Sequence, residues 1–153
     1  MGWWGYGILD GDTPLDRLCD WEDRTGCVDL YPLEKIGGTK RKKLVKYISE
    51  NKDKLFEMMA REVVKYDDYG NQYVKVQVDG AVWMASGVEM PECIKKICIR
   101  AAESDKLSEC SRKPDERERH MANYIQLIEK YNGTHPVFVD SVGLLEQIAK
   151  GIC

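Results

Sequence analysis

Apolar residues recur at intervals of three, four and seven along the stretch from Thr39 to Tyr66. This spacing places them on one side of a helix and predicts a long helical segment that Thr39 caps. Residues 49–53 contribute no apolar anchor, so the segment either bends there or consists of two helices. The buried side is predicted to carry Leu44, Tyr47, Ile48, Leu55, Met58, Met59 and Val63.

Four further helices are predicted from similar stripes and from residues that favour helix ends. The first begins at Pro14, is capped by Thr13, and ends near Gly26, where a left-handed turn is favourable. Another begins at Pro91 and extends to about Cys110. The four stripes are Leu15, Leu18 and Cys19; Ile94, Ile97, Cys98 and Ala101; Met121, Tyr124, Ile125 and Ile128; and Leu144, Leu145, Ile148 and Ile152.

Residues 67–71, Asp-Asp-Tyr-Gly-Asn, are predicted to form a turn. The segment 72–78 that follows has a different pattern. Val74, Val76 and Val78 alternate with polar residues, which is the period of a half-buried strand. No second convincing strand is present to pair with it, and a lone strand leaves its own backbone groups unpaired. By pattern alone the segment is therefore a short strand, and the missing partner strand is the argument against it.

The composition fits one domain with its own core. The chain has 153 residues, 43% apolar and 32% charged, and its formal net charge is −3. We predict a single helical domain over residues 1–153, mainly α, with five or six helices in a bundle and the N-terminal loop packed on it. No apolar run reaches ~18 residues, and no basic segment precedes an apolar one. A cytoplasmic protein without a membrane span is therefore expected.

The first twelve residues hold two tryptophans, four glycines and two aspartates. Such a segment is too rich in glycine for a helix and too aromatic for a disordered tail, which predicts an ordered loop. Adjacent tryptophans outside a helix point in different directions, so one of them is expected to be exposed. Because exposed aromatic residues are favoured in interfaces, the candidate binding residues are Trp3, Tyr6, Asp10 and Asp12.

Residues 4–12, Trp-Gly-Tyr-Gly-Ile-Leu-Asp-Gly-Asp, resemble the opening of a family of uncharacterised bacterial and phage proteins, a domain of unknown function. Members of that family begin Trp-Gly-x-Gly-x-x-(Asp/Glu)-(Asn/Gly)-Asp and continue into a helix. A second match covers residues 81–86 and the Pro91-Glu92 pair, where Met90 replaces the leucine of the family.

The resemblance implies a small, mainly helical domain and no particular activity. It also implies that the segment 72–78 is a short extended entry, followed by a helix from about Val78 to Val88.

The six cysteines are predicted to be reduced, because no export signal accompanies them. Zinc sites use close pairs such as Cys-x2-Cys, and the spacing of Cys93 and Cys98 is wider. Cys19, Cys93 and Cys98 fall near apolar stripes and are expected in the core. The sequence therefore predicts neither a metal site nor a cofactor.

Asp10, Asp12 and Asp16 form an acidic cluster with two interpretations. Carboxylates ligate divalent cations and act as general acids and bases, and together with His120 they would suit a metal-dependent hydrolase or a nucleotide-handling enzyme. Aspartates in turns also accept hydrogen bonds from backbone amides and cap helices. The structural interpretation is favoured, and the enzymatic one is kept as an alternative.

The strongest basic run is Lys40, Arg41, Lys42 and Lys43, followed by Lys46. Such a run can contact a phosphate backbone. Acidic residues dominate the surrounding chain, and no aromatic platform accompanies the lysines. A solvated helix face is therefore the favoured interpretation, and nucleic-acid binding through these residues is the second alternative.

The sequence favours a small binding protein over an enzyme, because it contains no nucleophile motif, zinc spacing or cofactor loop. The predicted partner is another protein. A bacterial or phage accessory protein that binds or inhibits another protein is compatible with the resemblance.

Overall fold

A computed structural model of the chain describes residues 7–107 and 112–139. Within these residues the protein is all-α, with six α-helices, one short 3-10 turn and no strand. The predicted mainly α fold is therefore confirmed, while the helix predicted at 144–152 lies outside the described residues. The helices are α1 (Asp12–Thr25), α2 (Gly38–Glu50), α3 (Lys52–Val63), α4 (Asn71–Ser86), α5 (Glu92–Glu103) and α7 (Pro114–Lys130), and the turn η1 is Leu33–Lys35.

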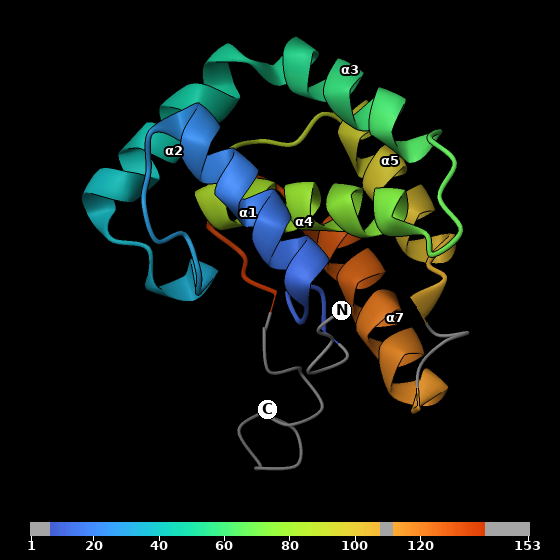
Figure 1. The fold of residues 1–153 in the computed structure, drawn as a ribbon. Coiled ribbons are helices and arrows are strands. Elements are labelled where there is room, and N and C mark those ends of the chain that lie inside the picture. Colours follow the sequence, from blue (N-terminus) through green and yellow to red (C-terminus); the bar gives the residue numbers. More distant parts are fainter. Residues whose placement is uncertain (1–6, 108–111, 140–153) are drawn as a thin grey trace.

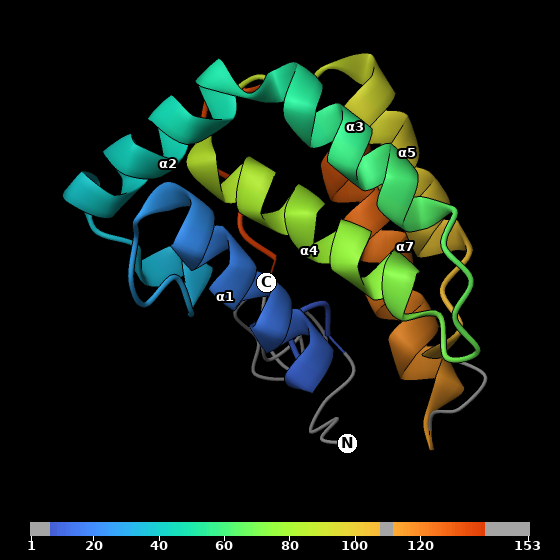
Figure 2. The same cartoon turned by 45° about the horizontal axis from the view of Figure 1, so that its top comes forward.

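Helix α4 is the centre of the domain (Figure 1). Helices α1, α2, α3 and α5 pack directly on it, and α7 packs on α5. Figure 2 shows α1 along one side of α4, with α5 and α7 along the other. The two sides are tied together through α4, which makes the described helices one domain around one hydrophobic core.

The prediction of an extended entry at 72–78 is wrong, because this segment is the first half of α4. Thirteen of the sixteen residues of α4 are buried, polar Gln77 and Asp79 included. A helix that is covered on every side has no polar face, so its sequence lacks the 3.6-residue period that marks a surface helix. The valines are buried in this helix, and only Asn71, Tyr73 and Lys75 of its residues are partly exposed.

Gly80 lets three helices approach closely. A Cβ atom at this position would lie 2.1 Å from the hydroxyl oxygen of Tyr124 on α7 and 2.7 Å from the Sγ of Cys98 on α5. Both distances are far below van der Waals contact, and both neighbours are fully buried. The glycine that weakens the helical pattern of α4 is therefore required by the packing.

The long helical segment predicted from Thr39 is two helices, in agreement with one of the two alternatives. Asn51 separates α2 from α3 and has a non-helical backbone, with φ −127° and ψ 24°. Its side-chain amide donates a hydrogen bond to the carbonyl oxygen of Tyr47 at 2.7 Å. The break thus falls where the apolar stripe is interrupted.

Helix α1 begins at Asp12, two residues before the predicted start at Pro14, and Gly11 stands at its cap instead of Thr13. The helix ends at Gly26 as predicted, with the left-handed φ of 75° that favours glycine.

The buried side of α1 is only partly the predicted one. Leu18 is buried, but Cys19 is exposed, and so is Cys93, whereas Cys98 is buried as predicted. In place of Cys19 the core side of α1 contains Arg17. The hydrophobic stripe therefore continues through a charged residue, which no apolar pattern could predict.

Helix α5 ends at Glu103, before the predicted end near Cys110. The next residues turn away from the helix axis, and the Asp105 carboxylate forms an ion pair with Arg117 of α7 at 2.8 Å.

Candidate functional site

The described part of the N-terminal loop packs on the core, as predicted. Ile8 and Leu9 are buried, and so is Asp10. The Oδ2 atom of Asp10 accepts a hydrogen bond from the backbone N–H of Gly7 at 2.8 Å. Asp10 therefore stabilises the turn from inside it, which is the structural role that the sequence favoured. Trp3 and Tyr6 lie outside the described residues.

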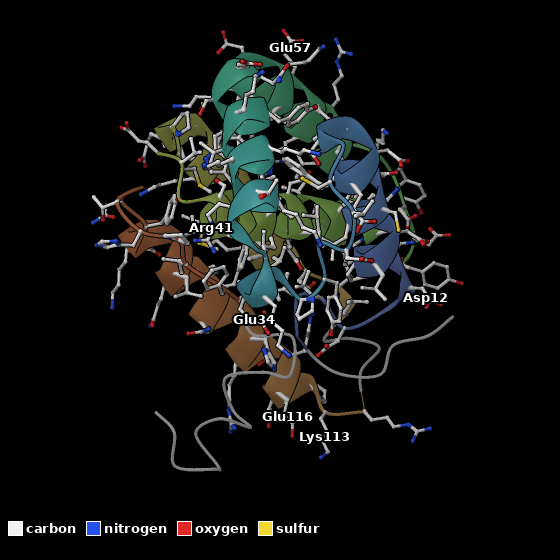
Figure 3. All side chains as sticks on the ribbon, turned by 90° about the vertical axis from the view of Figure 1, so that its left-hand side faces the viewer. Asp12, Glu34, Arg41, Glu57, Lys113 and Glu116 are labelled. Carbon is white, nitrogen blue, oxygen red and sulfur yellow. The ribbon has the colours of Figure 1, made fainter. Side chains whose placement is uncertain are left out.

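Of the four candidate binding residues, the structure describes Asp10 and Asp12, and Asp12 is the exposed one. It begins α1 and projects at the edge of the molecule (Figure 3). The neighbouring Thr13 hydroxyl donates a long hydrogen bond, 3.4 Å, to the side-chain oxygen of Asn71, the first residue of α4. The starts of α1 and α4 therefore lie side by side.

A cluster of exposed apolar side chains lies in the connection that leads into α4. We name residues 64–70 the tyrosine loop. Val64, Tyr66 and Tyr69 of this loop are 71%, 87% and 59% exposed, and they are three of the five strongly exposed large apolar residues in the described part of the chain. The sequence predicted a turn over residues 67–71 but gave no sign that its aromatic residues face solvent.

Local hydrogen bonds hold the tyrosine loop in shape. The Oδ1 atom of Asp67 accepts the backbone N–H of Tyr69 at 2.8 Å and, more weakly, that of Asn71 at 3.4 Å. Burial would raise the pKa of Asp67, but these donors lower it below its usual value. Gly70 completes the turn with a left-handed φ of 72°. The chain is thereby fixed on both sides of Tyr69.

Tyr66 is also held from within the loop. Its hydroxyl donates a hydrogen bond to the Oδ1 atom of Asp68, and this bond raises the pKa of the hydroxyl. The ring itself remains the most exposed of the large apolar side chains described. The loop thus presents aromatic faces to solvent with carboxylates beside them.

The predicted basic run is divided between two environments. Lys40 donates to the backbone oxygen of Asp29 at 3.4 Å, and the Arg41 guanidinium lies 5.9 Å from the centre of the Phe138 ring. Lys42 and Lys43 are exposed. Figure 3 shows Arg41 on α2, well away from Asp12 on α1. Two of the four residues therefore contact their own protein, and nucleic-acid binding by this run stays a prediction.

The enzymatic alternative required a metal ion held by the N-terminal carboxylates and His120. Within residues 7–107 and 112–139 no group of three or more His, Cys, Asp and Glu side chains is arranged to hold a metal ion. His120 lies half-buried on α7.

A buried charged network centred on Arg17 joins α1 to α4. The guanidinium donates from Nε and from Nη2 to the two oxygens of Asp79, each at 2.8 Å, and the Trp21 indole N–H donates to Asp79 at 2.7 Å. Glu62 of α3 lies 3.5 Å from the same guanidinium. Burial alone would lower the pKa of Arg17, but Asp79 raises it above its ordinary value. The charged form of Arg17 is thus favoured, whereas burial raises the pKa of Asp79 and the hydrogen bonds and charge of Arg17 oppose that rise.

A second buried arginine, Arg117, joins α7 to the N-terminal loop. It donates to the Asp105 carboxylate at 2.8 Å and to the side-chain oxygen of Gln77 at 3.0 Å. It also donates to the backbone oxygen of Gly7 at 2.9 Å. The side chain of Arg117 is only 2% exposed. Arg117 therefore connects the N-terminal loop, which contains Asp10, with α4 and with the end of α5.

Sequence reasoning missed both arginines. The sequence pattern indicates Gln77 only as a polar residue that alternates with the valines, and it does not single out Asp79, whereas each is the α4 partner of one arginine. A weak signal was present, because Arg17 falls between Pro14 and Trp21 at helical spacing. Arginine at such a position is more often a surface residue, so the pattern alone could not identify its role.

A thiol and a phenol are buried together beside Gly80. Burial raises the pKa of Cys98 to about 12 and that of Tyr124 well above its usual value. Both groups are neutral in the folded protein and ionise more readily once unfolded. Their contribution to stability is therefore complete below pH 9 and is lost as the pH rises toward 12.

We accordingly expect the free energy of unfolding to fall above pH 9, by up to about 1.4 kcal/mol per pH unit for each of the two groups. Urea unfolding at pH 8, 9.5 and 10.5 in the presence of a reductant measures this slope. The Cys98→Ala variant, although less stable at every pH, should show a shallower slope. An identical slope for the two proteins would contradict the assignment of the effect to Cys98.

The class of protein that these observations define is an all-α single domain with two buried arginine networks and an exposed tyrosine loop. No helix among the described residues is long and apolar enough to cross a membrane. In comparisons with protein-family models, curated proteins and solved structures, nothing matches this chain. The resemblance of residues 4–12 to the family opening stays a prediction.

Proposed function

We propose that this protein binds another protein, and that the tyrosine loop together with the adjoining start of α1 is its binding surface. The observation that supports this is the exposure of Val64, Tyr66 and Tyr69 within one loop. Single exposed apolar residues are common, but neighbouring ones mark interaction sites. Tyrosine is enriched in interfaces because its ring supplies a large contact area and its hydroxyl a hydrogen bond.

The shape of the loop supports the same function. The hydrogen bonds of Asp67 and the left-handed Gly70 order the backbone before any partner arrives. Tyrosine has few side-chain torsions to immobilise, so a complex on this loop loses little conformational entropy. A preformed aromatic loop of this kind is suited to specific binding.

Of the candidate binding residues predicted from the sequence, Asp12 lies beside this surface. Asp12 is exposed next to the start of α4, whereas Asp10 is buried and acts on the loop backbone. Trp3, Tyr6 and Asp12 remain candidates for direct contact with the partner. Asp10 is better suited to positioning the N-terminal loop than to touching a partner.

Affinity capture with quantitative mass spectrometry tests the proposal. We expect the double variant Tyr66→Ala/Tyr69→Ala to lose at least one protein that the wild type retains. Both tyrosines are exposed, so their removal should change the free energy of unfolding by less than about 0.5 kcal/mol each.

The matched control is Val28→Ala/Tyr31→Ala, which removes the other two exposed apolar side chains of the described residues, near the opposite end of α1. This variant should retain the same proteins as the wild type. If both double variants capture what the wild type captures, the tyrosine loop is not the binding surface and the proposal fails.

A further inference from the structure

We infer that the segment that docks on the tyrosine loop carries arginine side chains, an inference that rests on the proposed binding function. The loop combines exposed aromatic faces with acidic groups. Tyr66 and Tyr69 flank Asp67 and Asp68 in the sequence, and both rings are exposed. Aromatic faces attract cations through the negative charge density above the ring.

The carboxylates near these rings have room for a cation. Among the described residues, no lysine or arginine forms an ion pair with Asp68. The Tyr66 hydroxyl donates a hydrogen bond to one oxygen of the Asp68 carboxylate. This bond orients the carboxylate. A cation placed against the Tyr66 ring would therefore meet an oriented carboxylate at its edge.

The basic residues that the structure describes around the loop do not fill this position. Lys65 is paired with Glu62 at 3.4 Å. Lys106 lies with its alkyl chain against Gly70, and Lys75 acts on Asp67, whose pKa it helps to lower. These three lysines balance part of the local charge, and the exposed side of the loop at Tyr66 and Asp68 is left acidic.

Arginine fits this arrangement better than lysine. Its planar guanidinium stacks on an aromatic ring and at the same time donates two hydrogen bonds to a carboxylate. A lysine ammonium is more strongly hydrated and cannot form both contacts in one plane. The proposed recognition unit is thus the Tyr66 ring with the Asp68 carboxylate, and Tyr69 and Asp12 extend the surface.

The test uses the intact chain and two peptides, Gly-Arg repeated five times and the same peptide with citrulline in place of arginine. Citrulline keeps the size and the planar end group but has no charge. The peptides are titrated to millimolar concentration against the ¹⁵N-labelled protein at ~50 mM salt, and amide signals are followed by NMR. We expect the arginine peptide to shift the signals of residues 64–70, and the citrulline peptide to bind at least about fivefold more weakly.

Three variants separate the contributions. Tyr66→Ala and Asp68→Asn should each weaken binding of the arginine peptide about twofold to fivefold, the range expected for exposed cation–π and ionic contacts. Asp23→Asn is the matched control, because it removes the same charge from an exposed position near the far end of α1. It should leave the affinity unchanged within error.

Two results would overturn the inference. One is that the arginine peptide shifts no signals of the loop at millimolar concentration. The other is that Asp68→Asn and Asp23→Asn weaken binding equally, which would indicate general charge attraction. If the protein captured through Tyr66 and Tyr69 is retained equally by Asp68→Asn and at high salt, the binding function stands and the arginine inference alone fails.

Discussion

Replacing Asp79 by alanine is expected to lower the free energy of unfolding by about 3–5 kcal/mol, because it leaves a buried guanidinium without its carboxylate. Asp79 accepts two hydrogen bonds from Arg17 and one from the Trp21 indole, all at 2.8 Å or less. Glu62 remains within 3.5 Å of Arg17 and offsets a part of the loss. Urea unfolding followed by circular dichroism at neutral pH measures the change.

The control for Asp79 is Asp20→Ala, which removes an exposed carboxylate 3.9 Å from the same arginine. This change should cost less than about 0.5 kcal/mol, as is usual for exposed ion pairs. The double variant Arg17→Met/Asp79→Leu should recover a part of the stability, since it removes the unpaired charge but leaves the buried Trp21 N–H without its acceptor. A loss below ~1 kcal/mol for Asp79→Ala would show that water or Glu62 replaces its role.

Replacing Arg117 by methionine is expected to cost a similar amount, about 3–5 kcal/mol, and also to loosen the N-terminal loop. Methionine keeps much of the aliphatic volume but cannot donate to Asp105, Gln77 or the Gly7 backbone oxygen. The Asp105 carboxylate, which is 3% exposed, would then be buried without this cation. Amide hydrogen exchange should therefore accelerate at residues 7–11 more than in α2.

The matched control for Arg117 is Arg119→Met, at an exposed position on the same helix. Unfolding by urea and hydrogen exchange of residues 7–11 should both remain close to the wild type in this variant. If Arg117→Met unfolds the domain too far for exchange to be measured, Arg117→Lys provides a milder change that keeps the charge and loses the planar contacts. Unchanged exchange at residues 7–11 in both Arg117 variants would contradict the coupling.

The candidate binding surface could be predicted only in part from the sequence. The sequence predicts the binding surface where aromatic residues accompany aspartates at the N-terminus, and there Asp12 is exposed and Asp10 is buried. The same combination at Tyr66 to Tyr69 was identified only as a turn. Turn residues reveal where the chain reverses, but which side chains then face solvent depends on the elements packed around the turn.

The sequence by itself determined the helical class of the protein, the turn before α4, an interruption of the apolar stripe where α2 and α3 meet, and the end of α1 near Gly26. These features follow from local rules, namely apolar spacing and the backbone preferences of glycine. The tertiary structure decided that residues 72–78 are a central helix and that Arg17 and Arg117 are buried. Those outcomes depend on contacts between residues far apart in the chain, because a fully covered helix has no amphipathic period and a buried charge is recognisable only beside its partner.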